Sequence, residues 1–525
     1  PAFKAAVHEG QAWAIMGSYN KYKGEHCCHN QYLLNDLLKR DWGFDGVVVS
    51  DWGGVHDTKE AIFNGLDMEF GSWTNGLNWG QSNAYDNYYL AHPYLNLIKK
   101  GEVTEKELND KVRRILRLVF RTNMAKERHF GSFGTEEHAL AGRTIAQQGI
   151  VLLQNKKNVL PVDASKVKRV LVVGENAVKR MTVGGGSSSL KAKYEVSPLE
   201  GIKARLGDGA EVIYSPGYAS PAVKEQDVLG AEEPDKMEID ADALRNDAVK
   251  WAKDADVVFF VGGLNKNDGQ DCEGNDRSSL SLPYEQDQLI AELAKANPNT
   301  VVVIISGNAV AMPWVKQVPA IVEAWYSGTE AGNALASILF GDVNPSGKLP
   351  FTFPARLEDN GAHALGEHPG DSINVKYNES IFVGYRWADK QKKTKPLFAF
   401  GHGLSYTTFA YGKATATKKS LTADETITFT VPVKNTGSRE GSEVVQLYIG
   451  DKKSALPRPI KELKGFSKVK LVPGEEKMVS FTIDKTDLSY YDDTQNRWVA
   501  EPGVFEAFVG ASSDDIRSTV SFELR

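Results

Sequence analysis

The 525-residue sequence predicts an α/β multidomain protein that ends in a β-sandwich. Before about residue 400, short runs rich in Val and Ile alternate with amphipathic segments, a pattern typical of parallel sheets with crossover helices. After about residue 411, the hydrophobic pattern has a period of two and is divided by Asn-Thr-Gly and Pro-Gly-Glu turns. At roughly 150 residues per domain, the length allows about three domains.

The first region, residues 1–130, alternates strand-like and helix-like segments. Thr104 followed three residues later by Glu107 is a capping box and marks the start of a helix. Three expected strands are too few to close a barrel by themselves. The expected elements are strands at 13–17, 46–50 and 66–70, and helices at 31–40 and 104–120.

The second region is a further α/β domain with a mostly parallel sheet, expected at 166–400 after a linker at 131–165. The linker contains a helix at 138–148 and the apolar segment 150–153. In the domain we expect strands at 168–174, 256–262, 300–306 and 320–324, and helices at 248–255, 285–296 and 331–340.

The third region, 401–525, has strand-like runs at period two. About seven short strands in about 115 residues predict a β-sandwich of immunoglobulin or fibronectin type. The clearest strands are expected at 426–433, 443–449, 476–483 and 503–509.

Composition excludes several classes of function. The net charge is −6, and no Lys/Arg block is long enough to bind a polyanion, so no nucleic-acid partner is expected. No run of about 18 apolar residues occurs, so no membrane insertion is expected. The odd count of three cysteines is no disulfide framework, and no CxxC spacing indicates zinc. We therefore expect inert or locally paired thiols, no metal and no cofactor.

Asp51 is the first candidate for catalysis. It directly follows the strand expected at 46–50 and precedes Trp52 and two glycines. A carboxylate at the C-terminal end of a parallel strand lies where α/β folds place catalytic groups. The glycines allow a tight turn and the close approach of a ligand. The alternative is that Asp51 is the N-cap of the next helix, and position alone does not decide between the two.

The second candidate is the polar loop at 262–277, which follows the strand expected at 256–262 and is dense in carboxylates, Glu273 among them. Loops this long inside compact domains are usually functional or disordered. A calcium-like acidic loop or a solvated excursion are the alternatives, although the spacing matches no EF-hand.

Eight short runs occur in an order that resembles glycoside hydrolase family 3, across nearly the whole chain. The resemblance is to the three-domain type: a (β/α)8 TIM-like barrel, an α/β sandwich and a fibronectin type III-like domain. The runs are 16–20 (MGSYN), 42–46 (WGFDG), 49–52 (VSDW), 65–68 (GLDM), 184–187 (GGGS), 273–277 (EGNDR), 341–350 (GDVNPSGKLP) and 400–406 (FGHGLSY).

The resemblance implies an exo-acting retaining β-glycosidase with Asp51 as the nucleophile and Glu273 as the general acid/base. In a retaining mechanism one carboxylate attacks the anomeric carbon while the other protonates the leaving oxygen. Asp51 must stay ionised, whereas Glu273 must first donate and then accept a proton. The resemblance also implies substrate-site roles for Tyr19, which would hydrogen-bond the nucleophile, for the apolar walls Met16 and Trp52, and for Ser187 or Ser188.

The resemblance narrows the substrate to β-linked glucosides or oligosaccharides, because Trp52 follows the nucleophile where β-xylosidases commonly have Cys. A β-xylosidase or a dual-specificity exo-β-glycosidase is the alternative of the same class. A non-catalytic carbohydrate-binding relative would lack one carboxylate, and both are present. An interaction module built on the β-sandwich leaves the runs 50–52 and 273–274 unexplained. Family analogy suggests a periplasmic or secreted protein, and the chain could form a homo-oligomer.

Family members carry several barrel strands before the MGSYN run, so we expect residues 1–130 to be the C-terminal part of the barrel. We also expect the chain alone to be inactive. Other residues are interpreted structurally: a loop-fixing ion pair of Asp276 with Arg277, a turn at 401–406 between domains, and histidines His26, His29, His56 and His402. Asp67 is the remaining candidate for substrate contact.

Overall fold

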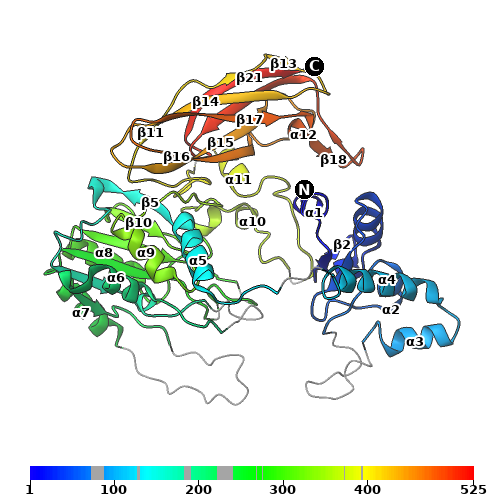
Figure 1. The fold of residues 1–525 in the computed structure, drawn as a ribbon, viewed down its shortest axis with the longest axis horizontal. Coiled ribbons are helices and arrows are strands. Elements are labelled where there is room, and N and C mark those ends of the chain that lie inside the picture. Colours follow the sequence, from blue (N-terminus) through cyan, green and yellow to red (C-terminus); the bar gives the residue numbers. More distant parts are fainter. Residues whose placement is uncertain are drawn as a thin grey trace. The chain divides into compact units, whose positions relative to one another are not determined.

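The computed structural model describes residues 1–71, 88–126, 130–182, 191–221, 240–267, 269–274, 276–371, 373–391 and 394–525. The chain divides into two compact units, Pro1–Ser132 and Phe133–Arg525. In Figure 1 the first unit is the blue part of the chain, and the second runs from cyan to red. Among the described residues, no helix combines the length and apolar character needed to cross a membrane.

The first unit is built around two parallel strands, β1 (Ala14–Gly17) and β4 (Val47–Ser50). The strand expected at 66–70 is wrong, because only a single parallel bridge joins Val49 to Met68 there. The other elements are α1 (Ala2–His8), the hairpin β2 (Lys21–Tyr22) and β3 (Glu25–His26), a 3-10 helix at Cys27–His29, a π-helix at Tyr32–Asp41, α2 (Thr58–Phe63), α3 (His92–Lys99) and α4 (Glu105–Arg121).

The hydrophobic pattern explains why β4 forms. Val47 and Val48 are both fully buried, as expected for a strand covered on two faces. Leu34 and Leu38 on the π-helix contribute to the same core cluster as Val48. The predicted helix start at Thr104 is confirmed, since its hydroxyl oxygen accepts the N–H of Lys106.

A six-stranded sheet forms the centre of the second unit, in the order β5-β10-β9-β8-β6-β7. All neighbouring pairs are parallel except β5 with β10, so the sheet is mostly parallel, as predicted. The segment 131–165, expected to be a linker, contributes β5, one of the two edge strands. The strands are β5 (Val151–Asn155), β6 (Arg169–Val173), β7 (Glu211–Ser215), β8 (Val257–Gly263), β9 (Thr300–Ile305) and β10 (Ala320–Glu323).

Helices cover both faces of this sheet (Figure 1). Side chains alternate along β6: Val170 and Val172 join one core cluster, Leu171 and Val173 the other. Helices α5, α6 and α9 pack into the first cluster, and α7 and α8 into the second. Their bounds are α5 (Glu136–Gly149), α6 (Pro198–Leu206), α7 (Ala241–Ala252), α8 (Gln286–Ala296) and α9 (Ala331–Leu339); two shorter helices follow, α10 (Gly361–Ala364) and α11 (Tyr385–Lys390).

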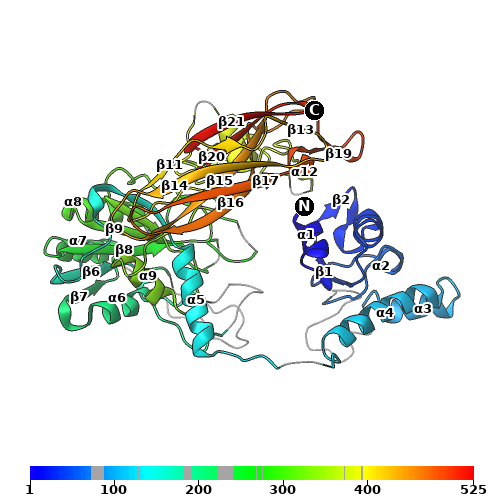
Figure 2. The same ribbon diagram turned by 45° about the horizontal axis from the view of Figure 1, so that its top comes forward.

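The C-terminal part of the second unit is the predicted β-sandwich, whose long strands run side by side in Figure 2. One sheet has the order β11-β14-β12 with β17 on β14, and the other β13-β21-β20-β15-β16. The strands are β11 (Phe409–Tyr411), β12 (Thr415–Ala416), β13 (Ser420–Leu421), β14 (Ile427–Asn435), β15 (Gly441–Asp451), β16 (Glu462–Leu471), β17 (Glu476–Ile483), β20 (Gly503–Gly510) and β21 (Ile516–Leu524), with α12 (Lys485–Leu488) and the hairpin β18 (Tyr490–Asp492) and β19 (Arg497–Val499) between β17 and β20.

The segment 401–406 joins the α/β sheet to the sandwich. The backbone N–H of Leu404 donates to the carbonyl of Leu152 on β5 at 2.8 Å. The Tyr406 hydroxyl donates to the carbonyl of Ile338 on α9 at 2.9 Å. Gly401 has φ +81, and a side chain there would collide with Gln446 on β15. The structural interpretation of this segment is therefore confirmed.

Candidate functional site

Asp51 leaves the C-terminal end of β4 and is half-buried. Its carboxylate accepts the backbone N–H of Trp52 at 2.7 Å, and Gly53 adopts a φ of +72, which favours glycine. The N-cap interpretation of Asp51 is wrong, because Asp57 caps the following helix α2 by accepting the N–H of Glu60. The carboxylate of Asp51 is thus not used as a helix cap.

A buried thiol lies close to Asp51. Cys28 is fully buried, and a side chain at Gly17 or Gly54 would meet it. Burial raises the pKa of the Cys28 thiol, and the nearby charge of Asp51 acts in the same direction. Cys28 is therefore a neutral packing group. All three cysteines are free thiols, so of the two expected alternatives, inert or locally paired, the pairing does not occur.

Met16, Tyr19 and Trp52 gather around the same strand ends as exposed side chains. Met16 is the register partner of Val49, and Tyr19 lies two residues beyond the end of β1. The Trp52 ring stacks on Phe70 with a centroid separation of 5.6 Å. Exposed aromatic and thioether groups beside a carboxylate are a suitable lining for a sugar ring.

Asp67, the candidate for substrate contact, is instead part of the framework. Its side chain has no exposed surface. It accepts hydrogen bonds from the ammonium of Lys39 and from the backbone N–H of Val48, both at 2.8 Å. Lys111 on α4 is also buried and donates to the carbonyls of Ala61 and Leu66. These polar groups fix β4 and the segment beside it.

Glu273 lies in the second unit on the loop that follows β8, and its side chain is exposed. The next residue, Gly274, has a φ of +105 with open space around it, so the backbone conformation itself requires glycine. The start of the loop is tied down, because the amide oxygen of Gln270 accepts the N–H of Asn265 at 2.9 Å. The loop therefore presents an exposed carboxyl from a fixed stem.

Sequence reasoning missed Asp271 as a member of the site. Its carboxylate accepts hydrogen bonds from Gly307, Asn308 and Tyr326, which follow two neighbouring strands. The only sequence signal was the Asp-x-Glu spacing to Glu273, which by itself predicts no contact.

The part of the loop after Glu273 does not form the ion pair that the sequence predicted. Asp276 approaches the ring of His368 at 3.2 Å, and Arg277 donates to the carbonyl of Ala309 at 2.7 Å. The expected ion pair between Asp276 and Arg277 is therefore replaced by these separate contacts.

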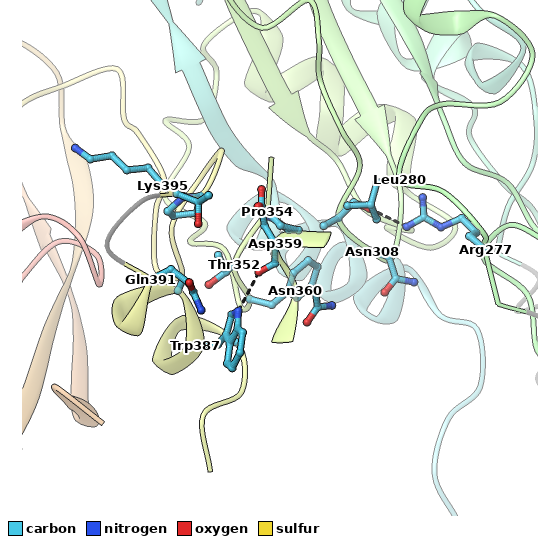
Figure 3. Close-up of a pocket in the computed structure, with 16 residues that line it drawn as sticks. Arg277, Leu280, Asn308, Thr352, Pro354, Asp359, Asn360, Trp387, Gln391 and Lys395 are labelled. Atoms are coloured by element: carbon cyan, nitrogen blue, oxygen red, sulfur yellow. Dashed lines mark hydrogen bonds between the residues drawn. The ribbon is translucent and has the colours of Figure 1, made fainter. Parts of the chain in front are cut away.

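Arg277 also lines a cavity of about 320 Å³, whose other walls include Asn308 after β9 and Trp387 on α11 (Figure 3). In Figure 3 the indole of Trp387 lies across the cavity from Arg277 and donates to the carbonyl of Asp359 at 3.1 Å. The mixed aromatic and polar lining is typical of small-molecule sites.

The remaining predicted site residues, Ser187 and Ser188, lie outside the described residues. In the part of the chain that the structure describes, no group of three or more His, Cys, Asp and Glu could hold a metal ion. His402 contacts the carbonyl of Leu153 at 2.8 Å, and His26 stacks on His56. Both contacts agree with the structural interpretation of these histidines.

Comparison with known proteins gives matches along the whole chain. Residues 1–118, 150–406 and 443–513 match the profiles described as glycosyl hydrolase family 3 N terminal domain, glycosyl hydrolase family 3 C-terminal domain and fibronectin type III-like domain. Beta-glucosidase BoGH3A of Bacteroides ovatus is 52% identical over 100% of this chain and 70% of its own length.

Two further proteins support the same relationship. Thermostable beta-glucosidase B of Acetivibrio thermocellus is 38% identical over 98% of this chain and 63% of its own length. The crystal structure of a GH3 beta-glucosidase from Bifidobacterium adolescentis superposes with a TM-score of 0.85 at 33% identity, covering 100% of this chain and 71% of that one. The chain thus spans about two thirds of the length of these relatives.

Proposed function

Because the chain belongs to glycoside hydrolase family 3, we propose that it acts as an exo-acting retaining β-glucosidase with Asp51 as nucleophile and Glu273 as acid/base. The observation that carries the proposal is the 52% identity to a β-glucosidase along the entire chain. The position of Asp51 supports it, since this carboxylate ends a buried parallel strand and caps no helix.

The reaction proceeds in two displacements. First, a carboxylate oxygen of Asp51 forms a bond to the anomeric carbon while the glycosidic C–O bond breaks, and Glu273 gives its proton to the departing oxygen. This step leaves a glucosyl ester on Asp51 and a Glu273 carboxylate. Next, Glu273 takes a proton from water, the water oxygen bonds to the anomeric carbon, and the ester bond to Asp51 breaks. Two inversions give β-glucose.

The surroundings of the two carboxyl groups suit these roles. The N–H of Trp52 stabilises negative charge on Asp51 and orients the carboxylate. The Trp52 ring, stacked on Phe70, would form an apolar wall of the sugar site. Glu273 lies on an exposed loop, where it can exchange protons with a leaving group and with water.

The test is a hydrolysis panel of p-nitrophenyl β-glucoside, β-xyloside and N-acetyl-β-glucosaminide with the full-length protein. We expect the highest kcat/KM on the glucoside. A higher value on the xyloside would favour the β-xylosidase alternative, and no cleavage of any substrate by the folded protein would favour a binding protein. Cleavage of the glucoside with inversion, followed by NMR of the released sugar, would contradict the two-step mechanism.

The proposal extends to β-linked oligosaccharides, from which the enzyme would release glucose at non-reducing ends. A periplasmic or secreted location and a homo-oligomeric state remain proposals from the family. Cell fractionation and light scattering of the full-length protein test them.

A further inference from the structure

Asp271 lies two residues before Glu273, and its carboxylate is held from two sides. Oδ2 accepts the backbone N–H of Gly307 at 2.6 Å and the hydroxyl of Tyr326 at 2.9 Å, and Oδ1 accepts the side-chain amide of Asn308 at 2.9 Å. Gly307 and Asn308 follow β9, and Tyr326 follows β10. One side chain on the loop after β8 therefore connects the C-terminal ends of three adjacent strands.

The donors that hold Asp271 are themselves fixed. The Ser306 hydroxyl donates to the carbonyl of Asn308 at 2.8 Å, and its oxygen lies 3.3 Å from a carboxyl oxygen of Glu323. Glu323 is fully buried, and burial raises its pKa well above the ordinary value, which favours the neutral acid. The ammonium of Lys266 lies 3.5 Å from the centre of the Tyr326 ring. This packing gives a defined geometry to the three donors around the Asp271 carboxylate, which we call the clamp on Asp271.

Hydrogen bonds hold the loop at Gln270 and Asp271. The N–H of Asp271 donates to the carbonyl of Asn265 at 3.1 Å. The side chain of Gln270 reaches the Tyr284 hydroxyl at 2.7 Å. After Asp271 come Cys272 and the exposed Glu273. Asp271 is thus the side-chain anchor immediately before the proposed acid/base.

We propose that Asp271 is a positioning residue that sets the place of the Glu273 carboxyl during the reaction, an inference that rests on the function proposed above. A carboxylate suits this task because it only accepts hydrogen bonds, and all three partners donate. An asparagine would lose the charge that strengthens these three hydrogen bonds and would turn one end of the side chain into a donor. The loop would then shift, and proton transfer to the leaving group requires a reach of about 2.6–3.2 Å.

The test compares Asp271→Asn with the parent full-length enzyme on β-glucosides whose leaving groups differ in acidity. A 2,4-dinitrophenolate departs without a proton, whereas the sugar leaving group of cellobiose needs one. We expect kcat/KM for cellobiose to fall about 10- to 100-fold. For the dinitrophenyl glucoside we expect a change below about 3-fold, because its first step needs no acid. Azide should raise kcat on this substrate and give β-glucosyl azide.

Two further variants separate positioning from general damage. Tyr326→Phe removes one of the three hydrogen bonds and should show the same pattern with a smaller loss on cellobiose. Asp276→Asn makes the matched isosteric change on the other side of Glu273, where the carboxylate faces His368, and should leave both substrates unchanged. Circular dichroism and thermal melting confirm that each variant is folded.

The outcomes distinguish this inference from the proposed function. Equal losses on both substrates in Asp271→Asn, or no loss on either, would overturn the positioning role. Glu273→Ala should show the same leaving-group dependence in a stronger form. If Glu273→Ala lacks it, the proposed acid/base is wrong and the inference falls with it. If Glu273→Ala shows it and Asp271→Asn does not, the inference alone is wrong.

Discussion

Gly17 and Ser50 are register partners at the C-terminal ends of the parallel strands β1 and β4. Asp51 therefore leaves its strand at the same level at which the chain turns toward Tyr19. The N–H of Phe70 donates to the hydroxyl oxygen of Ser50 at 2.8 Å and ties a third segment to this point. The proposed nucleophile thus starts from a backbone position fixed on two sides.

Asp51→Ala tests the nucleophile directly. Without the carboxylate no glucosyl ester can form, so we expect kcat on p-nitrophenyl β-glucoside to fall at least about 10³-fold. Added azide can take the vacated place and attack the anomeric carbon in a single inversion. The measurement is the rate with and without azide, with NMR of the product, which should be α-glucosyl azide.

The matched control for this variant is Asp45→Ala, which removes another carboxylate of the same unit. Asp45 forms a bidentate ion pair with Arg121 near the surface, so its removal affects the fold of the unit rather than the strand ends that carry Asp51. We expect unchanged kcat/KM. Full activity of Asp51→Ala without azide would show that the nucleophile lies elsewhere.

Lys111 gives a pH dependence of stability. Burial lowers the pKa of Lys111 from 10.5 to about 8. Between these two values the unfolded chain binds more protons than the folded one, so stability rises with pH across this window. Relative to Lys111→Met, the parent should gain about 3 kcal/mol between pH 8 and pH 10.5. Urea denaturation at several pH values measures the free energy of unfolding of both proteins. A difference between them that stays constant with pH would contradict the prediction.

Glu323 changes the stability with pH in the opposite direction from Lys111. Because burial raises its pKa well above 4.5, the folded state keeps a proton that the unfolded chain releases above that pH. The parent therefore loses stability as pH rises from about 4.5. Glu323→Gln cannot release a proton and should become progressively more stable relative to the parent as pH rises above about 4.5. Parallel denaturation curves at each pH check this, and the prediction fails if the difference is constant or reversed.

The junction between the α/β sheet and the sandwich should depend on Tyr406. Tyr406→Phe removes the hydrogen bond to the carbonyl of Ile338 and should lower the free energy of unfolding by about 1 kcal/mol. Tyr491→Phe removes a hydroxyl from an exposed tyrosine of the sandwich and serves as the control, with no expected change. Equal effects of both variants in urea denaturation would argue against a structural role of the junction.

The sequence predicted elements better than contacts. The run at 46–50 predicted β4 because a strand buried on both faces needs a continuous apolar segment. The strand expected at 66–70 failed because an alternation of apolar and charged residues does not show whether the backbone pairs over several residues or at one. The role of β5 in the sheet was missed for the same reason, since pairing with β10 joins residues far apart in the chain.

The candidate site shows the same limit. Asp51 and Glu273 could be recognised because each stands in a short run of residues with a defined order. The clamp on Asp271 could not, because its partners Gly307 and Tyr326 lie 36 and 55 positions further along the chain. Asp67 was considered for substrate contact, and only its burial and its ion pair with Lys39 reveal a structural role.

The hydrogen bond from Leu404 to Leu152 has a consequence for solubility. β5 is an edge strand, and an uncovered edge offers unpaired backbone groups to strands of other molecules. The segment that leads into the sandwich lies along β5 at this point and occupies one of those groups. This segment therefore covers part of the β5 edge, and we expect that shortening the chain before Leu404 would expose it to intermolecular β-pairing.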